Sequence, residues 1–113
     1  MKIKWLKGEE NLSDPYYVRR EVFIKEQNID EDLEWDEKDS EADHIVIYMD
    51  GKPVATGRII VDNGQYLLGR IAVLKEYRGR NLGRVLVENM MAKAFEMGAE
   101  EIHVHAQTRV RGF

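Results

Sequence analysis

The stretch from residue 78 to residue 84 has residue types and spacing that suit phosphate binding. It follows an apolar run typical of a strand and begins a helical pattern that ends near Gly98. A turn between a strand and a helix leaves backbone N–H groups without intrahelical acceptors, and the positive end of the helix dipole attracts anions. Three arginine side chains in the stretch add paired donors that suit phosphate oxygens. We therefore predict a diphosphate site formed by Arg78, Gly79, Arg80, Asn81, Leu82, Gly83 and Arg84.

Other phosphate-binding motifs do not fit this stretch. A Walker-type loop needs Gly-x-x-x-x-Gly-Lys-Ser/Thr, and no Lys-Ser/Thr pair follows the glycines. The dinucleotide motif Gly-x-Gly-x-x-Gly is also absent from the sequence. An ordinary turn between a strand and a helix, with solvated arginines, would use the same residues, so both interpretations stay open on this stretch alone.

Composition narrows the class of protein. The 113 residues, 43% hydrophobic and 34% charged, predict one soluble globular domain over residues 1–113. No apolar run approaches the roughly 20 residues of a membrane span, and no secretory signal opens the chain. The absence of cysteine excludes disulfides and thiolate metal sites, and fits a cytoplasmic protein without a bound metal. A net charge of −4 argues against general nucleic-acid binding.

The charge is unevenly distributed along the chain. Residues 1–43 contain 14 acidic and 7 basic residues, whereas residues 44–113 contain 7 acidic and 10 basic residues. The basic excess concentrates around the predicted turn, where the only acidic residue is Glu76. The basic residues concerned are Arg70, Lys75, Arg78, Arg80 and Arg84.

The secondary structure expected around this stretch alternates between strands and helices. Residues 3–6 read as a short strand, and Ser13-Asp14-Pro15 reads as a helix start with a capping side chain before the proline. Apolar residues at helical spacing extend that helix to about Lys25. Three strand-like runs at 44–49, 54–61 and 65–74, separated by turn residues, predict an antiparallel meander.

The predicted helix after the turn should pack on the sheet and lead into a last strand. Its apolar stripe contains methionines that we interpret as core residues, and Gly98 is the expected C-cap. Residues 101–106 read as a strand parallel to residues 65–74, joined to them by the helix. The stripe consists of Leu82, Val85, Leu86, Met90, Ala94 and Met97, widened by Val87, Met91 and Phe95.

The phosphate-binding stretch resembles the Arg/Gln-x-x-Gly-x-Gly/Ala motif of the GCN5-related N-acetyltransferases. Arg78 and Gly83 occupy the first and last positions of that motif, and Asn81 stands where the family usually has glycine. Asn tolerates the left-handed backbone conformation better than most other residues and keeps its N–H group. The resemblance implies that the stretch binds the pyrophosphate of acetyl-coenzyme A.

Other segments resemble the subgroup of that family that contains the ElaA and YjcF proteins. Residues 19–23 with Glu26-Gln27 look like one block, and residues 43–46, 69–73 and 106–107 look like three more. These blocks occur in the family's order and extend from residue 19 to residue 107. The resemblance implies an α+β fold with a central, mostly antiparallel sheet flanked by helices. It also implies acetyl transfer to a primary amine of a small molecule or a protein.

The resemblance further implies how the rest of the donor is bound. In this family the fourth strand diverges from the fifth, and the pantetheine arm pairs with the exposed strand edge. By position, Ile71, Ala72 and Val73 would offer main-chain groups to that arm and to the acetyl carbonyl. An N–H group directed at the thioester oxygen would stabilise the oxyanion that forms when an amine attacks.

The catalytic side chains are less evident. Residues 67–70 lack the carboxylate that many family members carry in this strand. His105 and Glu26 are the candidates for proton transfer, because imidazole titrates near neutral pH and a carboxylate can act as a base. Each also has a structural interpretation, as an exposed strand histidine and as an orienting carboxylate. We expect His44, which follows the acidic segment, to be structural.

The acidic segment at residues 30–43 allows two interpretations. It nearly fits a calcium loop, but Trp35 occupies the position that needs glycine and Lys38 interrupts the acids, so calcium is not expected. The segment is either a solvated loop or a negative rim that attracts cationic amines.

Two further expectations concern assembly and activity. The resemblance implies a short helix and two more strands after the approach at residues 111–113, and a sheet edge without those strands predicts a homo-oligomer. Because the usual leaving-group acid lies on that helix, two alternatives to an enzyme stay open. They are a non-catalytic module that binds acyl-coenzyme A and a structural or interaction protein.

Overall fold

The sheet has five strands in the order β1-β2-β3-β4-β5. The computed structural model describes residues 1–104, without the side chains of residues 32 and 33. The first four strands pair antiparallel with their neighbours, and β5 pairs parallel with β4. The predicted mostly antiparallel α+β fold is therefore confirmed. The strands are β1 (Lys2–Lys7), β2 (Asp43–Met49), β3 (Lys52–Asp62), β4 (Gln65–Val73) and β5 (Ile102–Val104).

Two tight turns confirm the predicted meander. Asp50 and Gly51 connect β2 to β3 with φ angles of 52° and 78°, and Asn63 and Gly64 connect β3 to β4 with the same two values. Positive φ at both central residues is the geometry of a type I′ hairpin turn, which Asp-Gly and Asn-Gly favour. Lys52 and Pro53, which we expected in the first turn, already belong to β3.

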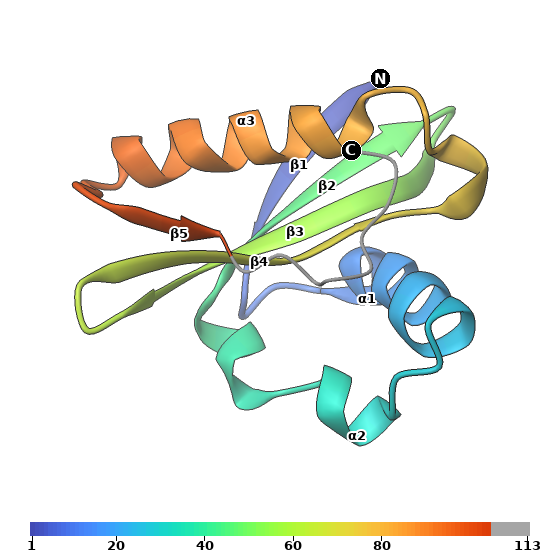
Figure 1. Cartoon of the computed structure of the whole chain (residues 1–113), viewed down its shortest axis with the longest axis horizontal. Helices are drawn as coiled ribbons and strands as arrows, with labels where there is room; N and C mark the ends of the chain where they lie inside the picture. The colour runs from blue at the N-terminus through green and yellow to red at the C-terminus, as the bar shows by residue number, and fades with distance from the viewer. Residues whose placement is uncertain (105–113) are drawn as a thin grey trace.

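Helices cover both faces of the sheet (Figure 1). α3 (Leu82–Glu96) lies over one face, and α1 (Ser13–Arg19) and α2 (Glu31–Glu34) lie on the other. α1 continues directly into a π-helical segment, η1 (Arg20–Glu26). Two 3-10 segments complete the chain, η2 (Glu37–Glu41) before β2 and η3 (Lys75–Tyr77) between β4 and α3. Within residues 1–104, no helix has the length and apolar character needed to cross a membrane.

The first helix has the predicted extent but begins differently from the prediction. Leu12 is its N-cap residue, and no side chain caps the helix. Instead, the amide N–H of Ser13 donates to Oδ1 of Asn11 over 2.9 Å. The expected cap by a side chain just before Pro15 is therefore wrong.

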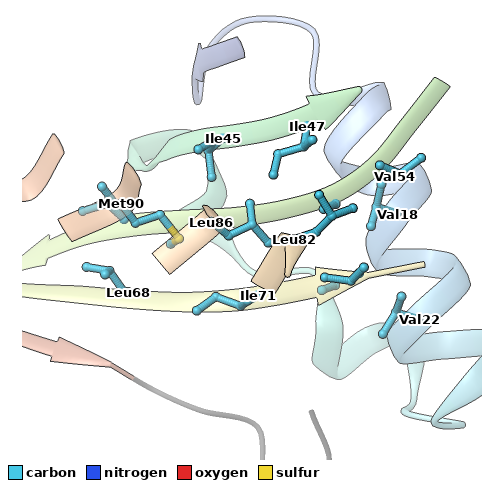
Figure 2. Packing of buried hydrophobic residues seen from close by; sticks show 14 of the residues in the cluster. Val18, Val22, Ile45, Ile47, Val54, Leu68, Ile71, Leu82, Leu86 and Met90 are labelled. Atoms are coloured by element: carbon cyan, nitrogen blue, oxygen red, sulfur yellow. The ribbon is translucent and has the colours of Figure 1, made fainter. Parts of the chain in front are cut away.

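α3 packs on the sheet through its predicted apolar stripe (Figure 2). Leu82, Leu86 and Met90 of α3 lie in the same buried cluster as residues of β2, β3 and β4. Met90 is fully buried and lies over Gly57 of β3, which confirms its predicted place in the core. Val87, part of the expected wider apolar face, packs against this cluster, but two other side chains of that face and one of the stripe are exposed. These are Met91 at 39%, Phe95 at 54% and Met97 at 37% exposure.

The predicted C-cap of α3 is confirmed. Gly98 has a φ of +111°, and its N–H donates to the carbonyl of Phe95 over 3.0 Å. The N–H of Ala99 donates to the carbonyl of Ala94, also over 3.0 Å. These two bonds form a Schellman motif, which ends the helix and turns the chain toward β5.

Candidate functional site

Within residues 1–104, β4 has a partner strand on its β5 side along only part of its length. β5 pairs only with Tyr66, Leu67 and Leu68 of β4. Just beyond that pairing, Arg70 has a φ of 51°, and the register between β3 and β4 shifts opposite it. This β-bulge bends β4 two residues after Leu68, which pairs with Val104 of β5. Among residues 1–104, no strand covers the edge of β4 from Gly69 to Val73.

The peptide groups at this open edge can be assigned from one hydrogen bond. The N–H of Leu74 donates to the carbonyl of Val54 in β3 over 2.8 Å. Because peptide groups alternate sides along a strand, Ala72 also faces β3, where it pairs with Thr56. Ile71 and Val73 then direct their main-chain groups to the open edge. Of the three residues expected to offer main-chain groups, two face the edge and Ala72 does not.

A side chain already occupies part of this edge. Nε of Arg78 donates to the carbonyl of Val73 over 3.0 Å. This contact agrees with the assignment of Val73 to the open side. The N–H of Val73 and both main-chain groups of Ile71 are the groups left for an extended ligand.

The first turn of α3 has backbone N–H groups available as hydrogen-bond donors and no acidic side chain. Asn81 is the N-cap residue, has a φ of 62° and a ψ of 19°, and makes no capping hydrogen bond with its side chain. Its left-handed conformation is the one that we expected asparagine to tolerate at this motif position. The first intrahelical bond runs from the N–H of Val85 to the carbonyl of Asn81 over 3.0 Å. The N–H groups of Leu82, Gly83 and Arg84 therefore have no acceptor within the helix.

Positive charge surrounds these donors. Arg84 lies in the first turn of α3, which contains no acidic residue. Arg80 is exposed, and its guanidinium lies 5.0 Å from the centre of the Tyr77 ring. Gly79 has a φ of +83°, with nothing near the position of a Cβ atom. Cations at the positive end of a helix dipole are unfavourable unless an anion binds there.

Arg78 and Glu26, two of the predicted site residues, form an ion pair. Nη1 of Arg78 lies 2.5 Å from Oε2 of Glu26, and Nη2 lies 2.6 Å from Oε1. The hydrogen bonds from Arg78 lower the pKa of Glu26, against the opposing effect of burial. The Glu26 carboxylate is therefore ionised and hydrogen-bonded to Arg78, which makes it a weak base.

An open hollow lies beside this ion pair. Its volume is about 240 Å³, and residues of α1, η1 and η3 line it together with Leu74. The side chains around it carry both signs of charge. They are Tyr17, Glu21, Val22, Lys25, Glu26, Leu74, Lys75 and Glu76.

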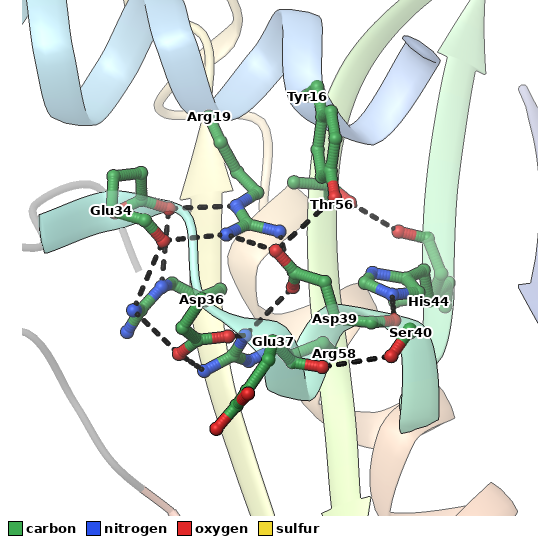
Figure 3. A network of polar contacts seen from close by, with 12 residues as sticks. Tyr16, Arg19, Glu34, Asp36, Glu37, Asp39, Ser40, His44, Thr56 and Arg58 are labelled. Atoms are coloured by element: carbon green, nitrogen blue, oxygen red, sulfur yellow. Dashed lines mark hydrogen bonds and ion pairs between the residues drawn. The ribbon is translucent and has the colours of Figure 1, made fainter. Parts of the chain in front are cut away.

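Part of the acidic segment is folded against the sheet, which corrects both of our interpretations for Glu34 and Asp39 (Figure 3). Arg19 of α1 binds Glu34 through Nε over 2.7 Å and Asp39 through Nη1 over 2.9 Å. Arg58 of β3 binds Asp39 and Asp36 through Nη1, each over 2.7 Å. Glu34 and Asp39 are each 2% exposed. These two carboxylates are buried and paired with arginines, so they belong neither to a solvated loop nor to a free negative rim. Glu31, Glu37 and Glu41 of the same segment are exposed, and for them both interpretations stay open.

The two buried carboxylates respond differently to this environment. Burial raises the pKa of Glu34, and the nearby arginines do not outweigh it. Burial also opposes ionisation of Asp39, but hydrogen bonds and charges from Arg19 and Arg58 outweigh it, so the pKa of Asp39 is lowered. Glu34 is thus the less well compensated carboxylate of the network.

Arg70 belongs to this network and not to the phosphate-binding stretch. Its Nε lies 3.2 Å from Oε2 of Glu34, and its Nη2 lies 3.4 Å from Oδ2 of Asp36. Our assignment of Arg70 to the basic surroundings of the turn is therefore wrong. The network had one signal in the sequence, a lone arginine at position 58 within an apolar strand, which needs a buried counter-charge.

The histidines have separate environments. His44 is 1% exposed, its Nε2 lies 2.9 Å from the carbonyl oxygen of Asp39, and burial lowers its pKa. The prediction that His44 is structural is confirmed. His105, the other proposed proton-transfer residue, lies outside the described residues. Within residues 1–104, no group of three metal-ligating side chains comes together.

Comparisons with known proteins identify the family of this chain. Residues 6–113 match the sequence model of the acetyltransferase (GNAT) family. The chain is 41% identical over 113 residues to the uncharacterized N-acetyltransferase YjcF of Bacillus subtilis (strain 168), covering all of this chain and 81% of YjcF.

Solved structures show the same fold. The crystal structure of ElaA from Escherichia coli superposes with a TM-score of 0.84 and 22% identity, covering 95% of this chain and 78% of ElaA. An acyl-CoA N-acyltransferase from Pseudomonas aeruginosa superposes with a TM-score of 0.82 and 23% identity, over 95% and 78% of the two chains. With its bulged β4 leading into a cationic helix start, the chain belongs to the acetyltransferase (GNAT) family of acyl-transferring enzymes.

Proposed function

We propose that this protein transfers the acetyl group of acetyl-coenzyme A to a primary amine of a small molecule or a protein. The observation that carries the proposal is the first turn of α3, where Arg84 stands among unpaired N–H groups and no acid is present. Such a turn is unfavourable alone and becomes favourable when an anion binds. The diphosphate of coenzyme A supplies that anion, bound by residues 79–84.

The open edge of β4 suits the rest of the donor. Pantetheine is an extended chain with two amide groups, and such chains pair with exposed strand edges. On this proposal, Ile71 binds an amide through its N–H and carbonyl, and the N–H of Val73 points toward the thioester. A donor at the thioester oxygen stabilises the negative charge that develops when the amine attacks the carbonyl carbon.

The reaction also needs two proton transfers. The amine must lose a proton to become a nucleophile, and the departing thiolate of coenzyme A must gain one. Glu26 is poorly suited to either role, because Arg78 holds its carboxylate and lowers its pKa. His105 stays our proposed proton-transfer residue. We expect His105→Gln to lower kcat more than it raises KM if this role is correct.

Titration of coenzyme A by calorimetry tests the donor site. We expect Arg84→Gln to weaken binding about fivefold, because it removes one charge-assisted contact, and added salt should shrink the difference. Lys93→Gln is the matched control, since Lys93 lies near the opposite end of the same helix. Equal binding by the wild type and Arg84→Gln would contradict the proposed diphosphate site.

Turnover of acetyl-coenzyme A with a panel of amines tests the reaction. Acetylated product with at least one amine supports an N-acetyltransferase. Binding of coenzyme A without turnover on any amine would favour a non-catalytic module, an alternative supported by the lack of a carboxylate at residues 67–70 of β4. No binding at all would leave a structural or interaction protein.

A further inference from the structure

We propose that Arg78 is a positioning residue, which fixes the end of β4 by binding Glu26 and does not itself bind the diphosphate. The inference rests on the proposed function, because it assigns a role within the same donor site. It divides the arginines of the motif into two groups. Arg78 holds the site in shape, whereas Arg80 and Arg84 supply the charge that attracts the ligand.

The first argument is the use of the guanidinium donors. All three nitrogen atoms of Arg78 already make hydrogen bonds, Nε to Val73 and the two Nη atoms to Glu26. The parallel pair of N–H groups that would bind two phosphate oxygens is the pair that binds the Glu26 carboxylate. Two of the five N–H groups remain, one on each Nη, and they no longer form a parallel pair.

The second argument is what the contacts join. Glu26 is the last residue of η1, Val73 is the last residue of β4, and Arg78 lies four residues before α3. One side chain therefore ties together the three segments that surround the upper part of the open edge. The hydrogen bond from Arg78 to the carbonyl of Val73 fixes the orientation of the main chain at this residue. The N–H of the same residue is the one proposed to face the thioester.

The third argument is charge and rigidity. If the ligand displaced Glu26 from Arg78, a carboxylate would stay close to a diphosphate, and like charges repel. The backbone around Glu26 has little freedom to withdraw it, because Gln27 donates to Val22 over 3.0 Å and Ile29 donates to Phe23 over 2.8 Å.

The test compares acetyl-coenzyme A with acetyl-pantetheine, which lacks the diphosphate. If Arg78 positions β4, Arg78→Ala lowers kcat/KM by a similar factor, about five- to tenfold, for both donors. Arg78→Lys should behave like Arg78→Ala, because an ammonium group cannot reproduce the fork. Arg84→Gln is the matched control, and it should affect only acetyl-coenzyme A.

Glu26→Gln decides between the two roles by the sign of its effect. We expect it to weaken coenzyme A binding about threefold, and the double variant with Arg78→Ala to be no worse than Arg78→Ala alone. Tighter binding by Glu26→Gln, or a loss in Arg78→Ala confined to acetyl-coenzyme A, would overturn the inference. Wild-type protein that binds no coenzyme A would instead overturn the proposed function, and the inference with it. Unfolding curves of each variant establish that the fold is intact.

Discussion

Arg19 and Asp39 form an ion pair inside the protein, with Nη1 and Oδ1 separated by 2.9 Å and side chains only 1% and 3% exposed. The pair connects α1 to η2 across 20 positions of sequence. Arg58 of β3 shares the same oxygen over 2.7 Å. The acidic segment is thereby attached to the face of the sheet that α1 covers.

We expect Asp39→Ala to destabilise the protein by about 3–5 kcal/mol, because it removes the carboxylate that two buried guanidinium groups share. Arg19 then keeps Glu34 as its carboxylate partner, and Arg58 keeps Asp36. Urea unfolding measures the difference. Glu31→Ala is the matched control, because Glu31 pairs with Arg20 at the surface, where both side chains are more than two-fifths exposed. The control should change stability by less than about 1 kcal/mol. Equal losses of unfolding free energy in the two variants would show that the buried ion pairs stabilise the protein no more than the surface pair.

The pH dependence of stability should distinguish Asp39 from Glu34. The folded-state pKa of Asp39 is lowered, so its stabilisation is present above the ordinary aspartate pKa and is lost as pH falls through the folded value. The folded-state pKa of Glu34 is raised, so stability falls as pH rises from the ordinary glutamate pKa through the folded value.

Unfolding free energies from about pH 3 to about pH 7 measure both effects. Relative to wild type, Asp39→Asn should be most destabilised near neutral pH, whereas Glu34→Gln should be most destabilised in acid. Parallel curves for the two variants would contradict the opposite pKa shifts.

At position 81, replacement by glycine should destabilise the protein less than replacement by alanine. The Asn81 φ of 62° is strained for residues with a Cβ atom, so Asn81→Ala should be about 1 kcal/mol less stable than Asn81→Gly. Asn89, in the middle of the same helix, is the control. There the order should reverse, because glycine is the poorer residue in a helix interior. Thermal unfolding of the four variants checks both orders, and the same order at both sites would refute the explanation.

Gly57 should resist even a small side chain. A Cβ atom there would lie 2.7 Å from Sδ and 2.8 Å from Cε of Met90. We expect Gly57→Ala to cost about 1–3 kcal/mol, and less in a Met90→Ala background, where the space is free. A double-mutant cycle measured by urea unfolding tests this coupling. Additive effects would mean that the close approach of α3 does not limit this position.

Local features of the fold could be predicted from the sequence. Asp50-Gly51 and Asn63-Gly64 determine their turns through their own backbone preferences, and Gly98 ends α3 in the same way. The left-handed conformation of Asn81 also follows from its residue type and its motif position. Each of these features depends on residues close together in the chain.

Features that depend on distant partners could not be predicted. Arg78 and Glu26 are 52 positions apart, so the residues around position 78 give no sign that the arginine is occupied. The acids of residues 30–43 look solvated because nothing nearby in the chain neutralises them. Apolar residues surround much of α3, and periodicity alone did not show that Met91 and Phe95 face outward.

The β-bulge at Arg70 has a consequence for solubility as well as for ligand binding. An uncovered strand edge is a template on which strands of other molecules can assemble into aggregates. The extra residue and the left-handed kink interrupt the regular spacing of donors and acceptors that such an intruding strand would need. Among residues 1–104, a short segment of β4 stays uncovered beside this irregularity, where a small flexible chain fits better than a regular strand.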